Sequence, residues 1–357
     1  MMKKLFALAL ALVMLCTMFA GCTSINDPGE EIAPRTVVDM TGETITLPET
    51  VDRVFVDWAS GITLITTLGA TEKLVVVPSA FETDTFAWTS IICPAINDVE
   101  KTDTPFTNVE VALNYEPDVV ITSTKDNIEI YQNLGLTVIY VKFNDNASFM
   151  ESLKIVGSAL GETEYWTAVK YCEYFEANVE VVTSALNGLK EEDMPTVYYM
   201  DSRFNDCVHT VGTGEIQEDW ITVAGGILAT AAEFEGRNLE INPEKILELN
   251  PDIIVIGAQN QAEVYDMLMN DPVLSALDAV KNGNVYRAPQ GLFPWCRTGP
   301  EAAIQMIWAA KLLHPDAFAE SDVKQVAANF YREFYGTEVS DSDLDGILAG
   351  KLCPTGK

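Results

Sequence analysis

Two stretches of the chain repeat one pattern of polar and apolar positions. Residues 108–121 read NVEVALNYEPDVVI, and residues 242–255 read NPEKILELNPDIIV. In each stretch the spacing predicts a short amphipathic helix, a Pro-Asp turn that ends it, and an apolar β-branched run typical of a strand buried on both faces. Because the similarity recurs at a fixed offset, it predicts a duplicated architecture of two α/β lobes.

Apolar runs of similar length predict the other strands. They cover residues 53–58, 74–78, 118–123 and 137–141 in the first lobe, and residues 196–201, 253–257 and 285–288 in the second. Between the two sets, apolar residues recur at helical spacing from Phe149, with a break near Gly161 and a second part over 163–190. Helices over 300–348 close the chain. The expected fold is α/β, with two Rossmann-like lobes of mostly parallel strands joined by a single long α-helix.

The N-terminus has the pattern of a bacterial lipoprotein signal. Lys3 and Lys4 precede an apolar run over 5–15, and Phe19-Ala20-Gly21-Cys22 matches a lipobox, in which Cys22 is acylated and the preceding peptide is removed. A transmembrane helix is the alternative, but the run is shorter than the roughly 20 residues that a span needs. We therefore expect an extracytoplasmic protein that is lipid-anchored to the cell membrane.

These patterns predict five consecutive parts of the chain. They are a signal peptide over 1–21, a polar tether over 22–35, an N-terminal lobe over 36–147, a linker helix over 148–190 and a C-terminal lobe over 191–357.

The chain is strongly acidic, with a formal net charge of -31 at pH 7. This charge argues against nucleic acid as a partner, because phosphate backbones attract basic surfaces. It also argues against close contact with anionic lipid, and solubility is its simplest explanation.

Cysteine and histidine limit the metal chemistry. Cys93, Cys172, Cys207, Cys296 and Cys353 remain once Cys16 leaves with the signal and Cys22 takes lipid. A disulfide such as Cys207 to Cys296 stays open, because sequence gives no connectivity. No pair has the Cys-x-x-Cys spacing of a thiolate metal site, and two histidines exclude a three-histidine site. His209 stays open as a haem ligand or as a solvent-facing polar residue.

The order of several motifs resembles one family of transport proteins. The chain is similar to substrate-binding proteins of ABC importers, of the helix-linked class III type that serves ferric siderophores, haem and cobalamin. The residues that carry the resemblance are the lipobox, Val38 to Gly42 with Leu47-Pro48, Leu68-Gly69-Ala70, the two Glu…Pro-Asp phrases, Gly225-Gly226 and the tail Phe330 to Gly336.

The resemblance implies a non-catalytic receptor without a resident cofactor. Its ligand is expected to be an iron chelate such as a siderophore, haem or a corrinoid, and its partners are the ligand, an ABC permease dimer with a cytosolic ATPase, and the membrane through the N-terminal lipid. An oxyanion such as molybdate or tungstate is the alternative within the same fold. A surface enzyme such as a chelatase, or an interaction module, is the alternative of another class.

The resemblance also assigns a docking role to one glutamate in each repeated phrase. In relatives, an exposed glutamate on each lobe fits an arginine pocket of the permease, and the matching positions here are Glu110 and Glu244. The alternative is that both are ordinary first-turn glutamates, which the helix dipole favours.

Candidate ligand-binding residues follow from the expected position of the cleft, outside the strand ends. Arg203, Arg237 and Arg297 are three of only seven arginines, and all fall in predicted cleft loops of the second lobe. They suit carboxylate, phosphate or oxyanion groups, although ordinary surface ion pairs explain them as well. Lys125 is a further candidate.

Three tryptophans are aromatic candidates for the same cleft. Trp58, Trp88 and Trp295 lie outside helical apolar spacing, and Trp295 stands two positions before Arg297, so that a flat chelate could stack on one and pair with the other. Core packing is the competing interpretation for Trp58. The remaining tryptophans fit helix faces and are expected in the core; they are Trp166, Trp220 and Trp308.

Overall fold

The computed structural model describes residues 35–353, except 83–85, 87, 105 and 107–108. The predicted signal peptide, the tether up to Pro34, Cys22 and Asn108 lie outside the described residues. From Arg35 onward the chain forms one compact unit, so the boundaries predicted between the lobes stay predictions. The fold class is the predicted one: a mixed α/β architecture with parallel sheets.

The first lobe is built on short parallel strands. Its sheet has the order β3-β6-β7, and a segment at Leu74 bridges to Val54 on the free side of β3 and leads into the parallel pair β4-β5. The bounds are β3 Val54–Val56, β4 Val77–Pro78, β5 Lys101–Thr102, β6 Val119–Thr122 and β7 Val138–Tyr140. All residues of β3, β6 and β7 are buried, as the continuous apolar runs predicted.

The second lobe has a four-stranded parallel sheet in the order β10-β8-β12-β13. The bounds are β8 Thr196–Asp201, β10 Ile227–Leu228, β12 Ile253–Gly257 and β13 Val285–Arg287. Two antiparallel pairs complete the strands: β1 Thr36–Val38 with β2 Thr44–Thr46, and β9 His209–Thr210 with β11 Leu239–Glu240. These pairs and β10 were not predicted, because two or three residues are too few to show a period.

The repeated phrases perform the same structural task in both lobes. Each gives a helix, α4 (Val111–Asn114) or α9 (Pro243–Leu249), followed by β6 or β12. The carboxylate of Asp118 accepts hydrogen bonds from the backbone N–H groups of Asp52 and Arg53, both at 2.8 Å. The carboxylate of Asp252 accepts from the backbone N–H of Thr196, also at 2.8 Å. The repeated aspartate therefore fixes the start of the neighbouring strand, β3 or β8.

Two helices connect the sheets, with the predicted break between them. They are α6 (Asn146–Leu160) and α7 (Glu162–Ala185), and Gly161 separates them. Asp145 and Ser148 form a capping box at the start of α6. The 24 residues of α7 span about 36 Å, somewhat less than the predicted helix, because α7 ends at Ala185 rather than near residue 190.

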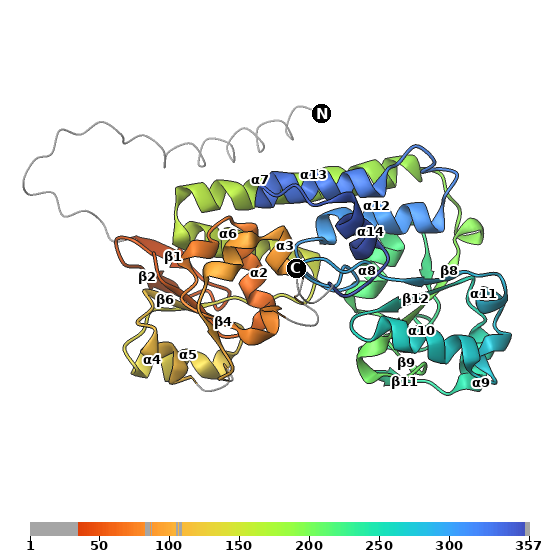
Figure 1. The fold of residues 1–357 in the computed structure, drawn as a ribbon, viewed down its shortest axis with the longest axis horizontal. Coiled ribbons are helices and arrows are strands. Elements are labelled where there is room, and N and C mark those ends of the chain that lie inside the picture. Colours follow the sequence, from red (N-terminus) through yellow and green to blue (C-terminus); the bar gives the residue numbers. More distant parts are fainter. Residues whose placement is uncertain (1–34, 83–85, 87, 105, 107–108, 354–357) are drawn as a thin grey trace, which may run out of the picture. The chain divides into compact units, whose positions relative to one another are not determined.

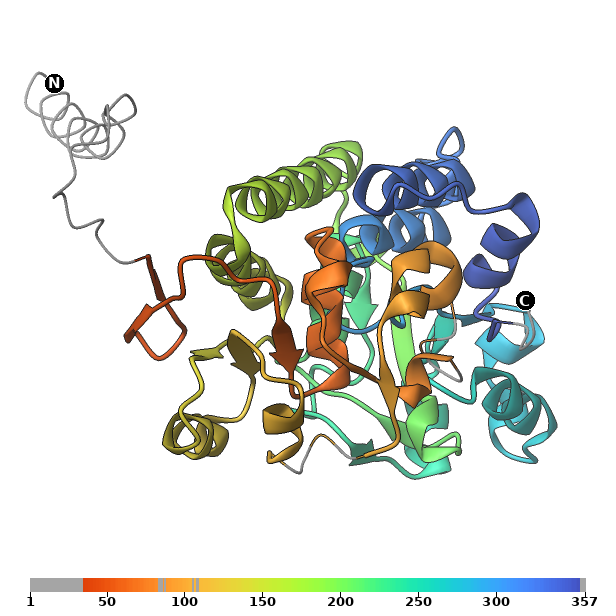
Figure 2. The ribbon, with the colours of Figure 1, turned by 60° about the vertical axis from the view of Figure 1, so that its left-hand side comes forward.

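The closing helices pack against α7 and reach both lobes. Their bounds are α12 Ala302–Leu313, α13 Val323–Tyr335 and α14 Asp341–Leu348. Figures 1 and 2 show α13 beside α7, and Figure 1 shows both above the two sheets. The Tyr335 hydroxyl hydrogen-bonds Thr67 at 2.9 Å, and the indole N–H of Trp88 donates to the carbonyl of Lys351 at 2.8 Å. The C-terminal segment therefore also supports the first lobe.

The remaining helices surround the two sheets. They are α2 Ala59–Thr67, α3 Thr89–Ile92, α5 Lys125–Asn133, α8 Ile216–Val223, α10 Gln261–Asn270 and α11 Asp278–Lys281. Within the described part of the chain, no helix is long and apolar enough to cross a membrane.

One hydrophobic core extends from the first sheet beneath α7 to the second. Trp220 is buried in it and Trp308 is partly buried, as expected, but the prediction for Trp166 is wrong because 56% of this residue is exposed. Trp166 lies in the first turns of α7, and its ring instead contacts the edge of the neighbouring Tyr165. Helical spacing alone could not tell which face of α7 is covered.

Candidate functional site

A cavity of about 120 Å³ lies between loops of the two lobes, and all three candidate arginines line it. Its floor is formed by the ends of β8 and β9 and by the start of α8, and Ser60, Phe143 and Asn144 line it from the first lobe. The residues from the second lobe are Tyr199, Asp201, Arg203, Val211, Glu215, Ile216, Gln217, Arg237, Phe293, Arg297 and Thr298. We call this space the arginine cavity.

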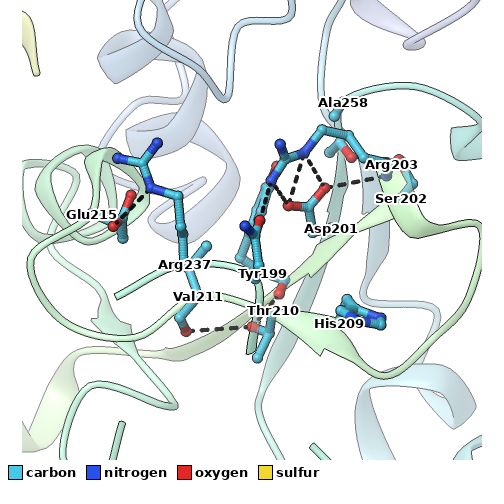
Figure 3. Close-up of polar contacts among 12 residues, drawn as sticks. Tyr199, Asp201, Ser202, Arg203, His209, Thr210, Val211, Glu215, Arg237 and Ala258 are labelled. Carbon is cyan, nitrogen blue, oxygen red and sulfur yellow. Dashed lines mark hydrogen bonds and ion pairs between the residues drawn. The ribbon is translucent and has the colours of Figure 1, made fainter. Parts of the chain in front are cut away.

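Arg203 is held by an aspartate at the end of β8. Its Nε lies 2.9 and 3.0 Å from the two carboxylate oxygens of Asp201, and one terminal nitrogen also donates to Asn238 Oδ1 at 3.0 Å (Figure 3). These hydrogen bonds raise the pKa of the Arg203 guanidinium, so its charge is permanent. Asp201 is 1% exposed, and Arg203 therefore balances a buried carboxylate as well as facing the cavity.

The other two arginines are less committed to partners. Arg237 reaches Glu215 at 3.4 Å, a loose contact at an exposed guanidinium (Figure 3). Arg297 is half-buried with its guanidinium carbon 5.0 Å from the centre of the Phe293 ring, and no ion pair joins it to a carboxylate in the part of the chain that the structure describes. Arg297 is therefore the arginine most available to an anionic ligand.

The loop that carries Phe293 and Arg297 is held in place by hydrogen bonds to a buried carboxyl group. Oε1 of Glu301 accepts from the backbone N–H of Leu292 at 2.6 Å and from the Tyr331 hydroxyl at 3.3 Å. A Cβ at Gly291 would collide with Glu301 Oε1 and with the Tyr331 hydroxyl, so glycine leaves room for both groups. Burial raises the pKa of Glu301 to about 8, which keeps the group neutral at pH 7.

The loops after β8 and β12 are tied to the same segment. The Ser202 hydroxyl donates to the carbonyls of Gly257 and Gln259, and the backbone N–H of Ala258 donates to Sγ of Cys296 at 3.2 Å. Ala258 has a positive φ of 75°, a conformation that side chains rarely adopt. The walls of the arginine cavity are thus connected to one another before any ligand arrives.

A second cavity of about 340 Å³ lies at the strand ends of the first lobe. The lining residues come from three places. They are Asp57, Trp58 and Ala59 directly after β3, Pro78, Ser79 and Ala80 at the end of β4, and Thr102, Asp103, Thr104 and Phe106 at and after β5. The ring of Trp58 lies 6.1 Å from that of Phe143, which lines the arginine cavity. The two cavities therefore adjoin at this ring pair, and we call the second space the Asp57 cavity.

The predictions for the aromatic residues require correction. Trp88 is 2% exposed with its N–H bonded to Lys351, and Trp295 is 1% exposed within the core, so both rings serve packing and neither lines a cavity described above. Trp58 is half-buried and lines the Asp57 cavity. Lys125 is exposed at the start of α5, with its ammonium 5.7 Å from the centre of the Tyr140 ring.

Sequence reasoning missed the carboxylates that line the two cavities. Asp201, Glu215 and Asp57 were not singled out, because 53 acidic residues hide any individual carboxylate. Asp57 and Asp201 do share one signal: each stands at the C-terminal end of a predicted strand, where cleft residues gather.

The cysteines and histidines that the structure describes form no metal site and no disulfide. Cys207 Sγ approaches the carbonyl of Val264 at 3.7 Å, and Cys296 Sγ contacts the Tyr199 hydroxyl at 3.6 Å, so the suggested bridge between these cysteines is absent. His209 pairs with Asp206 at 2.7 Å and stacks on Phe204. In the described ranges, no group of three or more potential metal-ligating side chains occurs.

Glu110 and Glu244 are both exposed at helix starts. Glu110 is the N-cap residue of α4, and Glu244 lies in the first turn of α9. The structure thus presents both at corresponding places of the two repeats, and their role in docking stays a prediction.

Comparison with known proteins identifies relatives along nearly the whole chain. The profile of a family described as periplasmic binding protein matches residues 56–292. The molybdate-binding protein MolA of Haemophilus influenzae is 21% identical, over 86% of this chain and 92% of its own. From Bacillus subtilis, the uncharacterized ABC transporter substrate-binding lipoprotein YvrC is 24% identical (89% of this chain, 100% of its own), and the Fe(3+)-citrate-binding protein YfmC is 23% identical (80% and 90%).

Solved structures share the fold. A periplasmic solute binding protein from Veillonella parvula superposes with a TM-score of 0.76 at 21% identity, covering 88% of this chain and 97% of its own. At this identity the likeness concerns the fold alone.

The buried carboxyl of Glu301 predicts a pH-dependent stability. In the unfolded chain its pKa returns to about 4.5, whereas the folded value is about 8, so the folded state retains a proton that the unfolded state loses. Its stabilising contribution is complete below pH 4.5 and declines as the pH rises to about 8. Glu301→Gln keeps the acceptor for Leu292 without titrating. Urea unfolding at several pH values measures this effect. Within this window, the free energy of unfolding of the variant should rise relative to that of the wild type by roughly 1 kcal/mol per pH unit.

The control for this measurement is Glu173→Gln, an exposed glutamate on α7. The free energy of unfolding of this variant should differ from that of the wild type by the same amount at every pH tested. A parallel pH dependence of wild type and Glu301→Gln would contradict the assignment of a neutral carboxyl.

Proposed function

The chain belongs to the periplasmic binding protein family, and we propose that this substrate-binding component of an ABC importer carries an anionic ligand. The observation that carries the proposal is the convergence of Arg203, Arg237 and Arg297 on one cavity, in a chain whose net charge is -31. Asp201 and Glu215 compensate Arg203 and Arg237 within the same cavity, so Arg297 supplies its excess positive charge. The forked guanidinium groups suit carboxylate or oxyanion groups.

We assign the ligand to the carboxylate-bearing iron chelates. Carboxylates pair with arginine forks, and the adjoining Asp57 cavity provides about 340 Å³ for the rest of a chelate. YfmC, named a Fe(3+)-citrate-binding protein, supports this class. Haem and corrinoids have less support, because the Trp295 ring that was expected to stack on a flat ligand is buried.

A compact oxyanion is the second candidate. The arginine cavity alone measures about 120 Å³, which suits a tetrahedral anion better than a whole chelate. The relative MolA is named a molybdate-binding protein. Isothermal titration of the purified protein with ferric citrate, molybdate, tungstate, haem and cobalamin separates the two classes, and no binding of any anion would refute the proposal.

Arg297→Ala should weaken ferric citrate binding by about tenfold or more. The loss follows from one charge-assisted hydrogen-bonding group, worth about 1.5–3 kcal/mol. Arg297 is preferred over Arg203 for this test, because removing Arg203 would leave the buried Asp201 without its partner. The dissociation constant from calorimetry is the measurement.

Arg287→Ala is the matched control. Arg287 lies on β13 and lines a different cavity, with Tyr265 and Trp308. Its removal changes the net charge by the same amount and should leave the affinity unchanged. Equal losses in both variants would indicate a general charge effect instead of a site.

We propose that Glu110 and Glu244 dock the two lobes onto the permease. Replacing both by alanine should reduce ligand uptake several-fold in cells that contain the cognate permease, while ligand affinity stays unchanged. Exposed charge pairs set register and encounter rate, and each contributes about 0.2–1 kcal/mol. Uptake of radioactive ligand is measured beside calorimetry on the same variant.

Glu263→Ala tests the helix-dipole interpretation of these glutamates. Glu263 is exposed in the first turn of α10, like Glu244 in α9, but it lies outside the repeated phrases. If its loss lowers uptake as much as the loss of Glu244, docking through the repeated glutamates is wrong.

We propose that the protein acts outside the cytoplasm, anchored by a lipid on Cys22. This cysteine lies beyond the described residues, and the support is the lipobox pattern of the sequence. Cells labelled with radioactive palmitate should incorporate label into the wild-type protein and not into Cys22→Ala. Labelling that persists in the variant would disprove the anchor at this position.

A further inference from the structure

The two lobes place an aspartate at the same topological position. In the second sheet, β8 lies between β10 on one side and β12 on the other. In the first, β3 lies between the segment at Leu74 and β6. After β3, and again after β8, later segments of the chain pair with both sides of the strand, so both strands are topological switch points. Open α/β sheets bind their ligands at such points. Asp57 directly follows β3, and Asp201 ends β8.

The two aspartates differ in how their charge is compensated. Asp201 is neutralised by the forked contact with Arg203. Oδ2 of Asp57 accepts from the Thr122 hydroxyl at 2.6 Å and from the Asn127 amide at 2.9 Å, both uncharged donors. No cation forms an ion pair with Asp57 among the residues that the structure describes, and burial raises its pKa.

The surroundings of Asp57 suit a hydrogen-bond donor from a ligand. The Asp57 cavity contains a second carboxylate, Asp103, and the side chain of Ser79. The Trp58–Phe143 ring pair connects its lining to that of the arginine cavity, and the segment from Asp57 to Ser60 lines one space at its start and the other at its end. One side of the cleft is therefore cationic, and the other offers acceptors.

We propose that the cleft takes a two-part ligand, in which an anionic group faces Arg297 and a hydrogen-bond donor, such as a protonated amine, faces Asp57. This inference rests on the proposed function, because the arginine cavity supplies the first contact. It narrows the ligand from iron chelates in general to carboxylate chelates that carry an amine or hydroxyl arm. The ammonium is the strongest donor for Asp57, since a charge-assisted hydrogen bond compensates a half-buried carboxylate best.

The test uses two ferric chelates that differ in one arm. Ferric nitrilotriacetate carries carboxylates only, and the ferric complex of Nα,Nα-bis(carboxymethyl)lysine adds a pendant primary amine. Calorimetry on the wild-type protein should show about tenfold tighter binding of the amine-bearing complex, the ratio expected for one charge-assisted hydrogen bond. Acetylation of the amine should abolish this preference.

Asp57→Asn, which keeps the size of the side chain, should abolish the preference too, so that the variant binds the two complexes with equal affinity. Asp126→Asn is the matched control, because Asp126 is exposed on α5 and makes the same change in charge. It should preserve the preference. Thermal unfolding shows whether Asp57→Asn still folds; if it does not, acetylation of the amine on the wild-type protein decides alone.

The outcomes separate this inference from the proposed function. Equal binding of the two complexes by the wild type, or a preference that survives Asp57→Asn, overturns the two-part ligand and leaves the anion site in place. If neither complex binds, both the anion site and the two-part ligand are wrong. A preference lost on acetylation and in Asp57→Asn alike supports the inference.

Discussion

The hydrophobic core beneath α7 extends through both lobes and holds them in a fixed relation, and the cleft depends on it. Tyr171 on α7 is fully buried at its centre, and its hydroxyl donates to the carbonyl of Pro300 at 2.8 Å. Its ring makes edge-to-face contacts with Phe149 from α6 and with Phe334 from α13. Each such aromatic pair adds about 1 kcal/mol beyond burial, and together they fasten both helices to α7. A hinge between the lobes would have to break this core.

The core that joins the two lobes also fixes the binding loops. Glu301 and Tyr331 belong to the closing helical region, and they hold the segment of Leu292 that leads to Arg297. Through these contacts, the position of Arg297 is set by the core and not by the ligand. A preorganised site of this kind loses little conformational entropy on binding, which favours affinity from few contacts.

The sequence predicted the architecture because repetition and burial leave strong patterns. Asp118 and Asp252 recur because backbone N–H groups at the start of β3 and β8 each need an acceptor. The same structural requirement therefore produces the same residue in both repeats. The arginines were also found, since cations are rare here and three of them fall in cleft loops.

Side-chain direction within loops could not be read from the sequence. Trp295 and Arg297 are two positions apart, yet the indole turns into the core while the guanidinium faces the cavity. Trp88 likewise satisfied its N–H at Lys351, a partner 263 positions away that no local pattern reveals. Loop conformation is decided by such distant contacts, which is why the candidate site was only partly predicted.

The rigid core that joins the lobes explains why charged groups of the cleft stay unpaired. Among the described residues, Arg297 has no carboxylate partner and Asp57 has no cation, although they line adjoining cavities. If the lobes closed freely, these two groups would gain by pairing with each other, and the cleft would neutralise itself. The core around Tyr171 resists that closure. Each charge therefore stays available, and the proposed two-part ligand would compensate both without any movement of the lobes.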